Sequence, residues 1–122
     1  TFGGNPLATR AGLEVMRIIQ QERLLEHASR VGEHLREGLA MLQDRHPHHC
    51  ETSRGVGLLQ GLELKQDNPE LGAKVVAQGL ERGLLLNAIQ GHILRFAPPL
   101  TIRRGEISAA IEILDEILGS LS

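Results

Sequence analysis

Residues 54–64, Arg-Gly-Val-Gly-Leu-Leu-Gln-Gly-Leu-Glu-Leu, decide the fold class of this chain of 122 residues. Leu58, Leu62 and Leu64 recur with a period of two between smaller or polar residues, which predicts a half-buried strand. We expect residues 54–57 to form a tight turn or a bulge before that strand, because glycine tolerates unusual backbone conformations. The glycines lack the spacing of a dinucleotide-binding loop and precede a strand instead of a helix, so they are not a phosphate loop.

A long helical region is predicted on the N-terminal side of this strand. Asn5 and Pro6 are typical of a helix start, since Asn caps the free amides and Pro needs no hydrogen-bond partner in the first turn. Apolar residues then recur at helical spacing as far as Leu42. We expect a bend or short break in the polar stretch 20–22, and an end of the helical region at His-Pro, residues 46–47.

Two further helices are expected towards the C-terminus. The Asp-Asn-Pro triplet at 67–69 restarts helical spacing, and Gly83 is a natural C-terminal cap. The last helix spans roughly residues 103–118, and Thr101 could cap it, but no Glu follows three residues later to complete a capping box. The residues expected to face the core are Leu71, Val75, Val76 and Leu80 in the first of these helices, and Ile107, Ala110, Ile111, Leu114, Ile117 and Leu118 in the last.

A second strand pair completes the expected order of elements. The run Leu-Leu-Leu-Asn at 84–87 predicts a short buried strand, Gly91 a turn, and residues 92–97 the hairpin partner. The order is helix, strand or strands, helix, two strands, helix, which predicts an α/β fold of the α+β type, with helices packed on one small, mainly antiparallel or mixed sheet. At this length we expect residues 1–122 to form a single domain.

Composition excludes several classes of function. The net charge is −2, and the chain has only two Phe and no Trp or Tyr, so neither a cationic field nor stacking platforms favour nucleic acid. No apolar run approaches the roughly 20 residues of a membrane span. The single cysteine, Cys50, cannot form an internal disulfide, which fits the cytoplasm. Because the chain begins at Thr1 without Met or a signal peptide, we expect it to be a piece of a longer protein.

Three segments carry residues suited to chemistry. The period of a strand places Arg95 on the face opposite Leu94 and Phe96. Its planar guanidinium group could bind the carboxylate of a ligand there, or form an ordinary surface ion pair. Residues 1–6 place a hydroxyl and two glycines before a helix N-terminus, which favours an anion but also fits a simple capped helix. Residues 46–50 contain three His and Cys50, yet no second ligand cluster, so we expect no metal site.

Four collinear motifs together resemble a known family. They are Thr-Phe-Gly-Gly-Asn-Pro-Leu-Ala at 1–8, the segment at 54–64, Arg-Gly-Leu-Leu-Leu-Asn at 82–87 and Leu-Arg-Phe-Ala-Pro-Pro-Leu at 94–100. They resemble the C-terminal part of class III pyridoxal-phosphate aminotransferases, with the strongest likeness to the acetylornithine branch. The resemblance extends over nearly the whole chain and implies the small C-terminal domain of a fold-type I enzyme, with the large cofactor-binding domain absent.

The resemblance also implies site residues and partners. Thr1 would reach the pyridoxal 5'-phosphate of the neighbouring subunit in a homodimer, with Gly3, Gly4 and Asn5 shaping that turn. Arg95 would bind the α-carboxylate of the substrate. No catalytic residue is expected in the chain, because neither Lys65 nor Lys74 lies in the family's lysine motif, so the isolated chain should be inactive and bind no cofactor. The implied partners are the chain's own large domain, a second subunit, and small amino-acid and 2-oxo-acid substrates.

The resemblance favours amino transfer from N-acetylornithine to 2-oxoglutarate in arginine biosynthesis. Another class III ω-aminotransferase, acting on ornithine, succinylornithine or 4-aminobutyrate, stays open, because the absent large domain sets much of the substrate choice. A hypothesis of a different class is a non-enzymatic regulatory module that binds a small carboxylate through Arg95.

Overall fold

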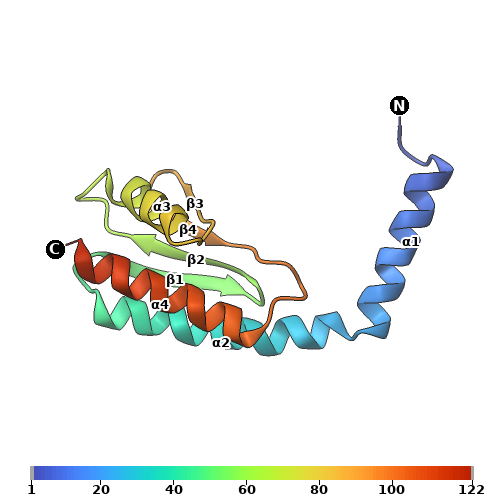
Figure 1. The fold of residues 1–122 in the computed structure, drawn as a ribbon, viewed down its shortest axis with the longest axis horizontal. Helices are drawn as coiled ribbons and strands as arrows, with labels where there is room; N and C mark the ends of the chain where they lie inside the picture. The colour runs from blue at the N-terminus through green and yellow to red at the C-terminus, as the bar shows by residue number, and fades with distance from the viewer. Residues whose placement is uncertain (1, 122) are drawn as a thin grey trace.

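The computed structural model describes residues 2–121, and over this range helices pack on one face of a four-stranded sheet while the first helix projects away from it (Figure 1). The elements are α1 (Pro6–Gln21), α2 (Leu24–Arg45), β1 (Cys50–Val56), β2 (Leu59–Leu64), α3 (Leu71–Glu81), β3 (Asn87–Ile89), β4 (Ile93–Phe96) and α4 (Arg104–Ser120). The predicted order of elements is confirmed, with a strand pair in place of the first strand.

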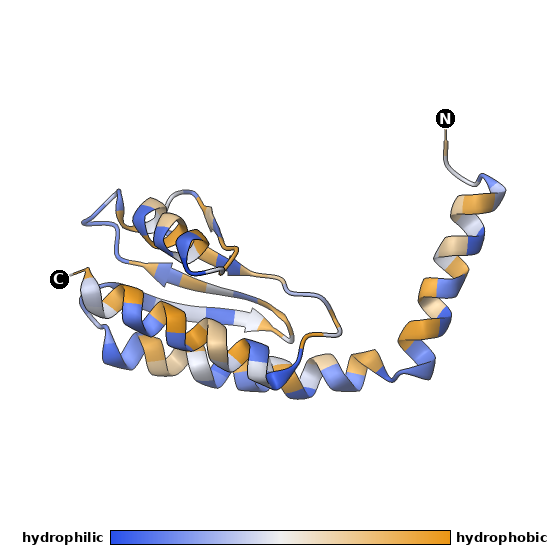
Figure 2. Cartoon of the chain, viewed as in Figure 1, coloured by the Kyte–Doolittle hydropathy of each residue, from blue (hydrophilic) through white to orange (hydrophobic). Residues whose placement is uncertain are grey.

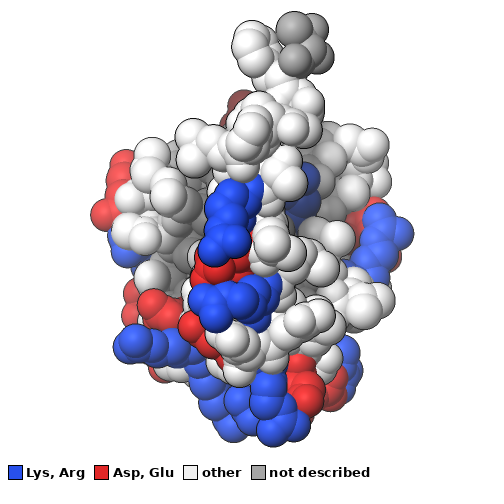
Figure 3. All heavy atoms as spheres, turned by 90° about the vertical axis from the view of Figure 1, so that its right-hand side faces the viewer, with Lys and Arg blue, Asp and Glu red and all other residues white. Residues whose placement is uncertain are grey.

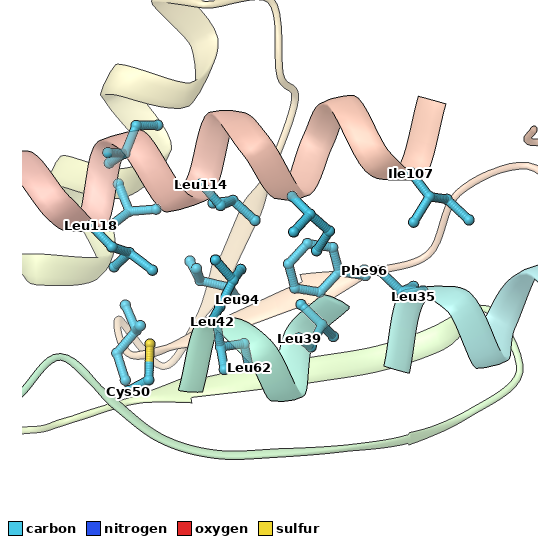
Figure 4. Close-up of a cluster of buried hydrophobic side chains, with 14 of the residues drawn as sticks. Leu35, Leu39, Leu42, Cys50, Leu62, Leu94, Phe96, Ile107, Leu114 and Leu118 are labelled. Carbon is cyan, nitrogen blue, oxygen red and sulfur yellow. The ribbon is translucent and has the colours of Figure 1, made fainter. Parts of the chain in front are cut away.

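The sheet has the strand order β1-β2-β4-β3, and each neighbouring pair is antiparallel. The prediction of a small sheet is therefore confirmed, and the sheet is antiparallel throughout. Helices α2, α3 and α4 contribute the side chains that cover one face, and the core between them and the sheet is almost entirely aliphatic (Figure 4). Side chains with no or almost no exposed surface include Leu39, Leu42, Leu62, Leu94 and Leu114.

The predicted break between α1 and α2 is confirmed. Arg23 adopts the left-handed conformation, with φ of 52°, so the two helices diverge at this point. None of the residues of α1 is buried, and the apolar side chains along this projecting helix are exposed (Figure 2). No helix within residues 2–121, α1 included, is long and apolar enough to cross a membrane.

The turn expected at residues 54–57 lies further along the chain. Arg54, Gly55 and Val56 belong to β1, and Val56 pairs with Leu59, so the hairpin turns over residues 57–58. The prediction was wrong because Gly55 serves close packing: a Cβ there would lie 2.3 Å from the Leu59 carbonyl oxygen. The register irregularity of this pair lies at the start of β1, between residues 50 and 52.

Two other details of the sequence prediction were wrong in the second half. Residues 84–86 are not a strand, β3 begins only at Asn87, and Leu85 is 83% exposed. Leu80 is also exposed, because the buried side of α3 is completed by Gly79, which packs against the Leu84 carbonyl oxygen. Three consecutive leucines and a glycine carry no clear periodicity, so the pattern could not assign these faces.

The start of α4 differs from the expected cap. The helix begins after Arg103 and not after Thr101, and the Arg103 backbone N–H donates to Glu106 Oε2 at 2.8 Å. An acidic residue in the first turn is thus present, where it stabilises the positive end of the helix dipole. The buried face of α4 was predicted correctly at Ile107, Ile111, Leu114, Ile117 and Leu118, while Ala110 is half-buried.

Candidate carboxylate-binding site

Arg95 lies in the middle of the sheet on the face that α2, α3 and α4 leave uncovered. Its neighbours Leu94 and Phe96 point into the core, with 0% and 8% exposure, while Arg95 itself is exposed. The period-two prediction for this strand is therefore confirmed. Among residues 2–121 no carboxylate forms an ion pair with Arg95, so its guanidinium group is available for a ligand.

The strand register places three other residues in one row with Arg95. Arg95 lies opposite Gly61 of β2 on one side and opposite Asn87 of β3 on the other. Gly61 in turn lies opposite Arg54 of β1. Because neighbouring strands are separated by about 4.8 Å, the Cα atoms of the two arginines lie about 10 Å apart, with only a glycine between them.

Two hollows meet at Arg95. One is a groove of about 510 Å³ whose walls are mostly apolar and include Leu85, Phe96 and Pro98, and its polar members are Asn87, Arg95 and Glu106. The other, of about 390 Å³, extends across the row towards Arg54. Apolar walls around a permanent cation suit a small carboxylate with an aliphatic body.

The chain that leaves β4 is held in place by hydrogen bonds. The Ile102 N–H donates to the Pro99 carbonyl oxygen at 3.0 Å, which closes a turn directly after the two prolines. His27 Nε2 donates to the Ile102 carbonyl oxygen at 2.7 Å and so ties this segment to α2. The wall of the groove beside Arg95 is therefore fixed by both local and long-range contacts.

The candidate phosphate-binding segment is described only in part, because Thr1 lies outside the described residues. Asn5 caps α1: its Oδ1 accepts from the Ala8 N–H at 2.9 Å, and its Nδ2 donates to the Phe2 carbonyl oxygen at 2.9 Å. Gly4 has φ of 76°, and a Cβ on either Gly3 or Gly4 would meet no atom within 4 Å. An open helix N-terminus of this kind fits the phosphate of pyridoxal phosphate.

The lysines do not fit the other end of that cofactor. The sequence contains only two, Lys65 and Lys74. Lys65 lies near Glu51, with 3.9 Å between Nζ and Oε2, and Lys74 pairs with Glu70 at 3.0 Å on the surface of α3. Neither Lys65 nor Lys74 lines either of the two hollows at Arg95.

Within the segment 46–50, His46 and Cys50 contribute to the fold. His46 Nε2 lies 2.7 Å from Asp115 Oδ1, and Arg45 pairs with the other oxygen of the same carboxylate at 2.6 Å. Cys50 is buried, and burial raises the pKa of its thiol to about 11. Within residues 2–121 no three His, Cys, Asp or Glu side chains are grouped to hold a metal ion.

Charge is mixed on the surface around α1. Basic and acidic side chains are interspersed on the end of the molecule from which this helix projects, with uncharged surface between them (Figure 3). Ion pairs within helices account for part of this pattern, as with Arg17 and Glu14, and their net contribution to stability is small. Arg10 of α1 and Arg104 of α4 also form no ion pair within residues 2–121, so Arg95 is distinguished by its place on an interior strand between two hollows.

Sequence reasoning identified Arg95 but missed the other members of the row. The sequence predicts that the strand ending at Asn87 pairs with residues 92–97, but not that Asn87 lies opposite Arg95 or that Gly61 lies on the other side, because register depends on how the strands align. It also missed Gln60, which is 5% exposed and donates from Nε2 to the carbonyl oxygens of Gly32 and Gly57 at 2.7 and 2.6 Å. An amide among leucines on the buried side of a strand was the available signal.

Comparisons with known proteins agree with this geometry. The family model described as aminotransferase class III matches residues 1–118. An acetylornithine aminotransferase of Synechocystis is 41% identical over 121 residues, which cover 99% of this chain and 28% of that protein. The crystal structure of acetylornithine aminotransferase from Elizabethkingia anophelis superposes with a TM-score of 0.91 at 29% identity, covering 99% of this chain and 30% of that one. The structure of ornithine aminotransferase from Plasmodium yoelii superposes with a TM-score of 0.89 at 27% identity, covering 98% of this chain and 31% of that one. The chain thus spans less than a third of the length of these relatives.

Proposed function

This chain belongs to the class III aminotransferase family, and on that basis we propose that residues 1–122 form the small C-terminal domain of a pyridoxal-phosphate-dependent aminotransferase. The observation that carries the proposal is the unpaired Arg95, which lies at the junction of two hollows on the uncovered sheet face. A permanent cation with a bidentate fork is the group expected where an amino acid must be held by its carboxylate.

The proposed reaction transfers the amino group of N-acetylornithine to 2-oxoglutarate in arginine biosynthesis. Support comes from the names of relatives, since three curated proteins that match nearly all of this chain at 38–41% identity are acetylornithine aminotransferases. The enzyme would be a cytoplasmic homodimer, in which the N-terminal segment of one subunit reaches the cofactor of the other.

When bound, pyridoxal phosphate supplies an electron sink for the amino-group transfer. The residues of this chain contribute binding and orientation. Arg95 would bind the α-carboxylate of the substrate, and Thr1 would hold the phosphate of the neighbouring subunit's cofactor through its hydroxyl and backbone N–H. Gly3 and Gly4 leave room for the phosphate to approach. The lysine that attaches the cofactor belongs to the large domain, so the isolated chain is expected to be inactive.

The decisive experiment uses the full-length protein that carries this chain. Pyridoxal phosphate is added, then N-acetylornithine, and the absorption band of the bound cofactor is followed. We expect the band to disappear with N-acetylornithine and to return with 2-oxoglutarate. A protein that binds no cofactor is not an aminotransferase, and a regulatory module that binds a carboxylate through Arg95 then takes its place.

Ornithine is the first alternative donor to test, because the Plasmodium yoelii ornithine aminotransferase has nearly the same fold over this chain. A higher kcat/KM with ornithine than with N-acetylornithine would move the protein to that branch. Arg95→Lys is expected to lower kcat/KM for either donor by about tenfold or more, because an ammonium cannot make the two parallel hydrogen bonds of a guanidinium. Unchanged kinetics would remove Arg95 from the site.

A further inference from the structure

Asn87 is the polar side chain placed beside Arg95 on the uncovered face. The two residues lie directly opposite each other on β3 and β4, so their side chains point to the same face, with Cβ atoms about 5 Å apart. Both are exposed, and both line the groove of about 510 Å³. Within residues 2–121 neither side chain has a hydrogen-bond partner, so both are free to meet one ligand.

We propose that Asn87 is a second ligand of the carboxylate that Arg95 binds, an inference that rests on the proposed function. A carboxylate offers about four lone-pair sites, and a bidentate guanidinium occupies two of them. The side-chain amide of Asn87 donates one N–H to a remaining site on the same carboxylate. Being neutral, it adds this hydrogen bond without competing for Arg95, as an acidic residue at the same position would.

The other neighbour of Arg95 cannot play this part. Gly61 has no side chain and lines the hollow that extends from Arg95 towards Arg54, so the row is open on that side. Arg95 therefore has a side-chain hydrogen-bond donor, Asn87, on one side and no side chain, at Gly61, on the other. This asymmetry directs the bound carboxylate towards β3, and leaves the hollow on the side of Arg54 for the rest of the ligand.

Two carboxylates on the elements around this row, Glu106 and Glu63, have partners of their own. Glu106 lines the same groove, but its Oε2 accepts from the Arg103 N–H at 2.8 Å. Glu63, on β2, has its Oε2 3.4 Å from Nη2 of Arg54 and its Oε1 3.8 Å from Nε2 of His92. Within residues 2–121 neither carboxylate forms an ion pair with Arg95, so the guanidinium group keeps its charge for a ligand.

The test measures binding of glutarate, an unreactive dicarboxylate, to the full-length holoenzyme by calorimetry. Asn87→Ala is expected to weaken glutarate binding about fivefold, the loss of one neutral hydrogen bond. Asn87→Asp is expected to weaken it about thirtyfold, because the new carboxylate pairs with Arg95 and repels the ligand. The KM for 2-oxoglutarate should rise in the same order.

Asn68→Asp is the matched control. It introduces the same charge in the loop before α3, outside both hollows of Arg95, and its oxygen can still accept from the Glu70 N–H. Glutarate binding should stay within about twofold of wild type in this variant, which excludes a general effect of added charge.

Wild-type affinity in Asn87→Asp, with an unchanged melting temperature, would overturn the inference. If that variant unfolds, Asn87→Ala decides alone, and unchanged binding in Asn87→Ala would overturn the inference equally. Arg95→Ala provides the reference: if it leaves glutarate binding unchanged, the pair is not a carboxylate site and the inference fails with it. Failure of the proposed function is a separate result, since it appears in the wild-type protein as no amino transfer.

Discussion

Gly32 offers the sharpest test of how α2 packs on the sheet. A Cβ at this position would lie 2.5 Å from both the carbonyl carbon and the carbonyl oxygen of Gly57, at the turn between β1 and β2. Gln60 fixes the same contact, because its Nε2 donates to the carbonyl oxygens of both glycines. The atoms that the new methyl group would meet are backbone, so no side chain can move aside, and the helix and the hairpin must separate.

The expected net effect of Gly32→Ala is a loss of about 2 kcal/mol in the free energy of unfolding. Overpacking costs about 1–3 kcal/mol, and we expect about 3 kcal/mol here because only backbone atoms can move aside. The better helix propensity of Ala offsets about 1 kcal/mol of this loss. Urea denaturation of the 122-residue chain, followed by circular dichroism, measures the difference. Gly105→Ala in α4 is the control, since its Cβ would meet nothing within 4 Å, and it should gain up to about 1 kcal/mol.

Gly38→Ala is expected to have an effect between those of Gly32→Ala and Gly105→Ala. Its Cβ would lie 2.7 Å from Cγ1 of Ile111, a side chain that can rotate, so the loss should be smaller than for Gly32→Ala. A Gly32→Ala chain as stable as the Gly105→Ala chain would refute the reasoning, because it would mean that α2 does not approach the hairpin turn closely enough to require glycine.

Three further predictions concern stability. Gln60→Leu should lower the free energy of unfolding by about 1–3 kcal/mol, measured in urea, because the Gly57 carbonyl loses its buried donor; an unchanged midpoint would contradict this. Burial raises the pKa of Cys50 to about 11, so the folded state favours the thiol, and the urea midpoint should fall as pH rises from about 9 towards 11. Cys50→Ala should lack that part of the decline, and equal slopes would refute it. Glu106→Ala should cost about 0.5–1 kcal/mol in thermal unfolding through the lost contact with the Arg103 N–H, and more than that would point to another role.

Local patterns in the sequence predicted the helices well. The spacing of apolar residues located α1, α2 and α4, and the polar stretch at 20–22 located the break that Arg23 makes. These features depend on neighbours three or four residues away, which the sequence displays directly. Gly55 was misplaced because a glycine required for close approach looks the same in sequence as a glycine required for a turn.

The candidate site was predictable only one residue at a time. The orientation of Arg95 follows from the period of a strand, so it could be predicted before any partner was known. The hairpin predicted between the strand that ends at Asn87 and residues 92–97 is confirmed by the antiparallel pair β3–β4. The alignment of Gly61 and Arg54 with Arg95 depends instead on the order β1-β2-β4-β3, in which β4 lies between β2 and β3. Strand order is set by packing across the whole sheet, and no local signal in the sequence specifies it.

The position of Arg95 on an interior strand also explains why binding would be precise. β4 is hydrogen-bonded on both sides, and Leu94 and Phe96 anchor the strand in the core, so the backbone beneath the guanidinium has little freedom. A binding group on such an element holds its geometry better than one on a loop. Because no lysine of this chain lies near Arg95, carboxylate binding and cofactor attachment fall to different parts of the enzyme under the proposed function. Their relative position would then be set by how the two parts pack, and substitutions at that contact should change kcat without changing the affinity for glutarate.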